Sequence, residues 1–112
     1  MSYDYNPEDD GLKYLGSIDF ETGSYEWDTI TVYVHPENNQ FYWEDGSGCS
    51  CNGPMEYITS LASFDTGSLG DFVKLVQARV QDELLSTYNT PAGKANILEE
   101  AATVLKEAVK YA

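Results

Sequence analysis

The chain has 112 residues, of which 42% are hydrophobic and 13% aromatic, and its formal net charge is −13. That length suits a single domain with one small core, and the apolar content is too high for a disordered chain. No apolar run approaches the ~20 residues that span a bilayer, and the opening MSYDYNPEDDG lacks the basic and apolar regions of a secretory signal. We therefore expect a protein that is neither secreted nor embedded in a membrane.

The negative charge is concentrated in the first part of the chain. Residues 1–66 contain thirteen acidic residues and one basic residue, Lys13, whereas residues 67–112 contain six acidic and five basic residues. Direct binding to nucleic acid or to an anionic membrane is disfavoured, because phosphate contacts require lysine or arginine. A basic protein partner is favoured electrostatically; the alternative is that the acidity only keeps the protein soluble.

Residues 1–11 are polar and rich in turn-forming residues, which predicts a loose N-terminal arm. A first strand is expected at residues 13–20, with one face formed by Tyr14, Gly16, Ile18 and Phe20. After a turn at residues 21–24, residues 25–35 predict a strand that is apolar on one face and aromatic on the other. The apolar face consists of Ile30, Val32 and Val34, and the aromatic face of Tyr25, Trp27 and Tyr33.

A third strand is predicted at residues 40–44, after a turn at residues 36–39. Residues 45–53 are rich in glycine, which indicates a tightly turning connection. Pro54 suits the first position of a helix, with Glu56 in its first turn, so we expect a short helix over residues 54–62 that residues 65–67 then break.

Two longer helices follow. Ser68 and Asp71 resemble a capping box that opens a helix extending to about Tyr88, and Pro91 can begin the last helix. Both helices repeat apolar residues with the spacing of one buried face. The expected fold is a single α+β domain over residues 1–112, in which a three-stranded antiparallel meander packs against a C-terminal α-hairpin and a short helix.

Cys49 and Cys51 are the first candidates for chemistry. Two thiols in a glycine-rich turn can form half of a zinc site, with His35, the chain's only histidine, as a further ligand. The spacing matches no common zinc signature, and the cysteines can instead pack as small apolar groups or act in redox chemistry. The chain has no phosphate-binding loop, no nucleophile elbow and no metalloprotease motif, so we expect it not to be an enzyme.

The second candidate is an aromatic patch with an acidic rim, an arrangement common at protein-binding hot spots. The residues assigned to this predicted patch are Tyr25, Glu26, Trp27, Asp28, Tyr33, Tyr42, Glu44 and Asp45. The alternative is that the aromatic face is simply the side of the sheet that the helices bury.

Residues 15–83 also carry a recognisable arrangement of motifs. The aromatic strand Phe41-Tyr42-Trp43 leads to Asp45, then to the turn Gly48-Cys49-Ser50-Cys51, and then to Pro54 and Glu56. This arrangement resembles a family of small acidic proteins of actinobacterial phages and prophages, although Gly46-Ser47 and Asn52-Gly53 depart from the family pattern. The resemblance implies a phage-type protein in the cytoplasm of a bacterial host, and it implies no catalytic residues.

The leading functional hypothesis is a non-enzymatic accessory protein that binds a basic host protein through its acidic, aromatic N-terminal half. One version is a host-takeover or anti-defence factor whose carboxylates imitate the phosphates of DNA. The alternatives are a metal- or thiol-dependent module at Cys49-Ser50-Cys51 and a small virion or assembly component.

Overall fold

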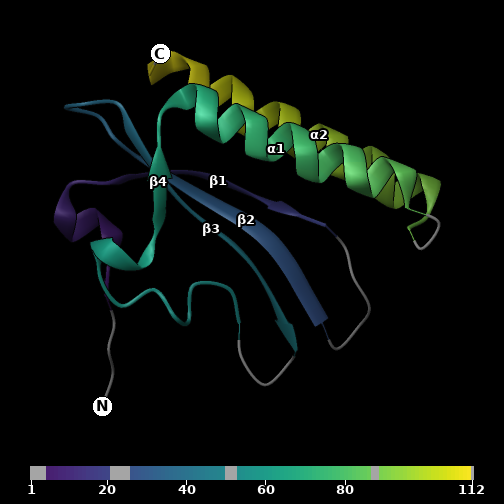
Figure 1. The fold of residues 1–112 in the computed structure, drawn as a ribbon, viewed down its shortest axis with the longest axis horizontal. Helices are drawn as coiled ribbons and strands as arrows, with labels where there is room; N and C mark the ends of the chain where they lie inside the picture. Colours follow the sequence, from purple (N-terminus) through teal and green to yellow (C-terminus); the bar gives the residue numbers. More distant parts are fainter. Residues whose placement is uncertain (1–4, 21–25, 50–52, 87–88, 112) are drawn as a thin grey trace.

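The computed structural model describes residues 5–20, 26–49, 53–86 and 89–111, with only the backbone described at Cys49. The elements in chain order are η1 (Pro7–Asp10), β1 (Lys13–Asp19), β2 (Glu26–His35), β3 (Gln40–Cys49), η2 (Leu61–Ser63), β4 (Asp65–Gly67), α1 (Leu69–Leu85), α2 (Pro91–Ala108) and η3 (Val109–Tyr111). The helices α1 and α2 lie side by side against one face of the sheet, while η1, residues 53–60 and η2 lie on its other side (Figure 1). The predicted α+β class and the α-hairpin are confirmed.

The sheet is an antiparallel meander of four strands in the order β1-β2-β3-β4, one more than predicted. The additional strand is β4, where the sequence indicated only a helix break; it pairs with Phe41–Trp43 of β3. Thr66 anchors it, because the Thr66 hydroxyl donates a 2.7 Å hydrogen bond to the Phe41 carbonyl and accepts one from the Gln40 amide. A strand of three residues carries too short an alternation to be recognised from sequence.

β3 is also longer than predicted. It continues through the glycine-rich residues to Cys49, and every residue from Asp45 to Cys49 pairs with β2. The ten-residue β2 provides the ladder that keeps this segment extended. Gly46 lies under the Trp27 ring, where a Cβ atom would be 3.4 Å from the indole. The glycines here serve close packing within a strand, and the prediction of a turn at residues 45–49 was wrong.

A β-bulge divides β1 between Tyr14 and Gly16. Tyr14 therefore lies against Tyr33, with ring centroids 5.4 Å apart, whereas Ile18 points into the core beneath the helices. The predicted common face holds for Ile18 and Phe20 and is wrong for Tyr14, because one extra residue reverses the alternation of side chains.

The main core lies between the sheet and the two helices. Its buried residues are Ile18, Phe20, Ile30, Val32, Val34, Phe41, Trp43, Phe72, Val76, Ile97, Ala101, Val104 and Ala108. The predicted capping box at Ser68 and Asp71 is confirmed, and Thr90 caps α2 with Pro91 in its first turn. The helix α1 ends at Leu85, earlier than predicted.

A second, smaller core lies on the opposite face of the sheet. Its buried residues are Leu12, Ile58 and Phe64, and five half-buried residues surround them: Tyr5, Tyr33, Tyr42, Met55 and Leu61. The short helix predicted at residues 54–62 is absent from this described segment, which forms turns and then η2. Met55 has a φ of 71°, in the left-handed region that an α-helix does not use.

The predicted loose arm is ordered from Tyr5 onward. The Asn6 side chain accepts a hydrogen bond from the Glu8 backbone amide and so caps η1, and Gly11 ends it in the left-handed conformation. Pro7 is buried, and Leu12 and Tyr5 belong to the second core. Residues 1–4 lie outside the described part of the chain.

Gly16 allows α2 to approach β1 closely, because it has no side chain. Its φ is 150°, and a Cβ atom there would lie 3.0 Å from Cγ2 of Val104. We predict that Gly16→Ala lowers the free energy of unfolding by about 1–3 kcal/mol, measured by urea denaturation. Gly53→Ala is the control, because a Cβ atom there would meet nothing within 4 Å. Equal losses in the two variants would contradict this role of Gly16.

The capping box predicts a pH dependence of stability. The Ser68 amide donates a 3.0 Å hydrogen bond to the Asp71 carboxylate, which lowers the pKa of Asp71. A depressed folded-state pKa stabilises the protein above the unfolded-state pKa, and this contribution is lost as the pH falls through the folded-state value. The difference in unfolding free energy between wild type and Asp71→Asn should therefore shrink as the pH falls from neutral to about 2. A difference that grows on acidification would contradict this role of the Asp71 carboxylate.

Candidate functional site

The predicted patch is divided between the two faces of the sheet. Side chains alternate along a strand, so Trp27 and Tyr33 of β2 lie on the face turned away from the helices, as do Tyr42 and Glu44 of β3. Asp28 and Asp45 lie on the face beneath α1, where both contact Arg79. Glu26 is exposed at the start of β2, and Tyr25 lies outside the described residues.

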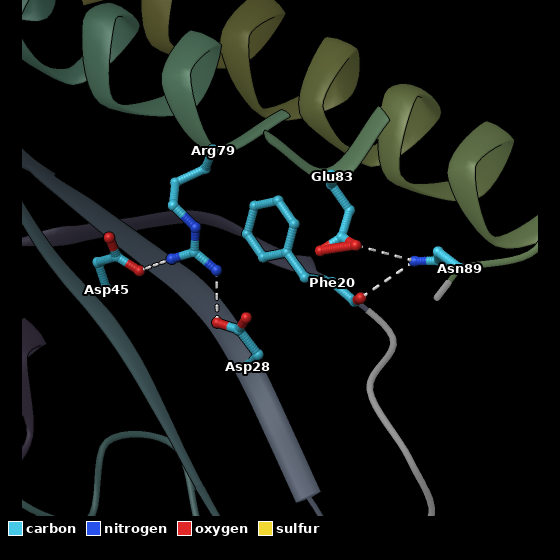
Figure 2. Close-up of polar contacts among 6 residues, drawn as sticks. All are labelled: Phe20, Asp28, Asp45, Arg79, Glu83 and Asn89. Atoms are coloured by element: carbon cyan, nitrogen blue, oxygen red, sulfur yellow. Dashed lines mark hydrogen bonds and ion pairs between the residues drawn. The ribbon is translucent and has the colours of Figure 1, made fainter. Parts of the chain in front are cut away.

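Arg79 holds α1 to the sheet (Figure 2). Its Nη2 atom lies 2.5 Å from Oδ1 of Asp28, and its Nη1 atom donates to Asp45 on the neighbouring strand. The guanidinium also lies over the Phe20 ring, 4.3 Å from its centroid. Burial alone lowers the pKa of Arg79, but the hydrogen bonds and negative charges of the two carboxylates outweigh it and raise that pKa.

This cluster is a structural ion pair within the domain. The Arg79 side chain is 23% exposed, and each aspartate side chain is 22% exposed. One arginine between two carboxylates gives the cluster a net charge of −1. The guanidinium N–H groups of Arg79 donate to these two carboxylates. Asp28 and Asp45 therefore join α1, β2 and β3, which makes them poor contacts for a partner.

A second polar link holds the connection between the helices. The Asn89 side-chain amide lies 3.4 Å from the carbonyl oxygen of Phe20 and 3.5 Å from a carboxylate oxygen of Glu83 (Figure 2). It ties the start of α2 to the end of β1, beside Arg79. The end of the α-hairpin is thereby fixed on the sheet.

The aromatic residues on the other face are partly covered. Tyr33 and Tyr42 contact Phe64, with ring centroids 5.6 and 6.1 Å apart. Burial, together with the neighbouring Tyr14 and Glu8, raises the pKa of Tyr33. The helices do not cover this face; residues 5–12 and 53–64 do. Among the aromatic side chains that the structure describes, Tyr14, at 49%, and Tyr57, at 66%, are the most exposed.

Acidic side chains surround this cover. Glu8 and Asp9 of η1 are exposed, as are Glu37 after β2 and Glu56 in the segment that follows β3. In the described part of the chain, no lysine or arginine lies within ion-pair distance of these four residues. Glu44 is half-buried, and its carboxylate accepts a 2.7 Å hydrogen bond from the Met55 amide. We call the exposed side chains of Glu8, Asp9, Tyr14, Glu56 and Tyr57 the acidic face.

The structure does not bring His35 and Cys49 together. His35 pairs with Gln40 at one end of the β2–β3 hairpin, and Cys49 pairs with Glu26 at the other. Nine residues of strand separate these ends, a span of about 30 Å. Cys51 lies outside the described residues. Within the described ranges, no group of three histidine, cysteine or acidic residues is placed to hold a metal ion.

Sequence reasoning missed the role of Arg79. It is the chain's only arginine, and it lies three residues after Val76, whose position in the apolar repeat faces the sheet. A single arginine at a sheet-facing helix position was a usable signal. The two aspartates that it pairs with could not be selected from nineteen acidic residues without the strand register.

Comparison with known proteins gives one match. A family model described as a domain of unknown function (DUF7574) matches residues 1–108. The chain belongs to this family. No curated protein and no solved structure matches the chain significantly. No helix in the described part of this DUF7574 domain is long and apolar enough to cross a membrane.

The Arg79 cluster predicts a large loss of stability when its cation is removed. Arg79→Met leaves two partly buried carboxylates facing each other, which should cost about 2–3 kcal/mol in a urea titration. Replacing Asp28 and Asp45 by asparagine in the Arg79→Met protein should restore part of that loss. Lys110→Met breaks an exposed pair with Glu107 and should change stability far less than Arg79→Met does. An Arg79→Met variant as stable as Lys110→Met would contradict the assignment.

Proposed function

We propose that this domain is a non-enzymatic accessory protein that binds a basic host protein through its acidic face. The observation that carries the proposal is the segregation of charge. The described residues before Gly67 form the sheet, except for that last residue of β4, and the cover of its far side. Residues 1–66 contain thirteen acidic residues and one lysine. Of the chain's six basic residues, the other five lie on α1, α2 and η3.

The geometry favours some of these acidic residues as contacts over others. Asp28 and Asp45 are held by Arg79, whereas Glu8, Asp9 and Glu56 have no such partner in the described part of the chain. Tyr14 and Tyr57 add exposed aromatic side chains to the same side of the molecule. A tyrosine surrounded by carboxylates suits a partner surface rich in arginine and lysine. Each cation of the partner can pair with a carboxylate and also lie over an aromatic ring.

The finer part of the proposal concerns origin and role. The resemblance of the aromatic strand and Gly48-Cys49-Ser50-Cys51 to actinobacterial phage proteins supports a phage-type protein that acts inside a bacterial host. The many exposed carboxylates create a negative electrostatic field. This field supports the version in which the protein imitates the charge of DNA and binds a host protein that handles nucleic acid. Such a partner is attracted over long range, and salt weakens the attraction.

The test is capture from an actinobacterial lysate after nuclease treatment, with the full chain immobilised. We expect a basic protein to be retained at low salt and released at high salt. Substituting Glu8→Gln, Asp9→Asn and Glu56→Gln together should abolish this retention. The glutamine keeps the acceptor through which Glu56 receives a 2.9 Å hydrogen bond from the Gly53 amide.

The control removes the same charge from the helices, through Asp82→Asn, Glu99→Gln and Glu107→Gln. This variant should retain the partner almost as well as wild type, because its acidic face is intact. Equal retention by both triple variants would contradict the assigned surface. The absence of any basic protein bound at low salt would contradict the proposed function.

A further inference from the structure

An apolar groove runs between α1 and α2 and opens to solvent. Its volume is about 370 Å³. The residues that line it are Val76, Gln77, Val80, Gln81, Leu84, Leu98, Ala101, Ala102 and Leu105. Val76 and Ala101 form part of the main core, so the groove lies directly over it. No charged side chain is among the lining residues, in contrast to the acidic face.

The leucines beside the groove project into solvent. Leu84 is 38% exposed and Leu98 is 45% exposed. On α2, Leu98, Ala102 and Leu105 form a second apolar stripe next to the buried stripe that packs on the sheet. This stripe faces α1 across the groove, and the contact between the two helices still leaves Leu98 and Leu84 exposed. The second stripe is suited to an interface.

Charge restricts what can occupy this groove. Residues 67–112, which include both helices, are almost neutral, with six acidic and five basic residues, whereas residues 1–66 carry nearly all of the charge of −13. Two copies therefore repel each other strongly unless their helical layers meet. That contact places the two acidic layers on opposite outer sides. A basic partner, by contrast, finds no carboxylate in the groove.

We propose that a second copy of this chain occupies the groove, forming a two-fold dimer through α1 and α2. The patch is self-complementary, because one surface holds both the projecting Leu84 and Leu98 and the groove that can receive a leucine. A two-fold interface requires this property. With the 17 residues of α1, each helix is about 26 Å long and about 10 Å wide, so the pair can present a face of at most about 26 by 20 Å. Such a face is close to the smaller specific interfaces, so dimerisation in the micromolar range is expected.

Sedimentation velocity of the full chain tests this proposal. From low to high micromolar concentration, the mass should rise toward that of two chains. Adding salt should strengthen the dimer, because screening reduces repulsion between two chains of charge −13. This response is opposite to that of the acidic face, so each proposal can fail without the other. A chain that stays monomeric at high concentration and high salt would overturn the dimer.

Variants locate the interface. Leu98→Glu and Leu98→Lys should each weaken dimerisation by about tenfold to a hundredfold, because both lose the same buried leucine whatever the sign of the new charge. Leu98→Met should keep the dimer, because methionine is apolar and similar in size to leucine. This variant can still be measured if both charged variants misfold. Ala62→Glu is the control, since it adds a charge at an exposed residue of η2, on the other side of the sheet. Circular dichroism confirms folding, and dimerisation of folded Leu98→Glu at wild-type strength would overturn the assignment.

Discussion

The structure depends on β2 being covered on both faces. Ile30, Val32 and Val34 pack beneath the helices, and Tyr33 packs against residues of the second core. The strand also pairs along both edges, with β1 and β3. A central strand with two cores holds together two layers of very different charge. One layer is the nearly neutral α-hairpin, and the other is the acidic cover formed by η1 and residues 53–64.

The Arg79 cluster joins the α-hairpin to the sheet. It binds the carboxylates of Asp28 and Asp45, which would otherwise repel each other across adjacent strands, and it fixes the position of α1 over β2 and β3. Outside this cluster, the carboxylates of Glu8, Asp9, Glu37 and Glu56 are exposed. The protein thus uses its single arginine for folding and leaves its acidic face without a cation of its own in the described part of the chain.

The elements with long, regular patterns were predictable from sequence, and the short or irregular ones were not. Both helices follow from their apolar repeats, from the capping box at Ser68 and from Pro91 at the start of α2, and β2 follows from its alternation. The bulge near Tyr14 breaks the alternation of β1, and the close approach of Gly16 to Val104 on a distant helix is not visible in a local pattern. The strand over residues 45–49 is imposed by pairing with β2, against the turn preference of its glycines. The acidic character of the N-terminal half was evident, but the separation of its paired and exposed carboxylates required the register.

Hydrogen–deuterium exchange on the complex with the captured basic protein tests the central claim most directly. If the acidic face is the binding surface, protection on binding should appear in residues 5–14 and 53–60, while α1 and α2 exchange as they do in the chain alone. Protection confined to α1 and α2 would show that the partner binds the helical layer. That result would contradict the division of the molecule into an acidic binding face and a neutral helical layer.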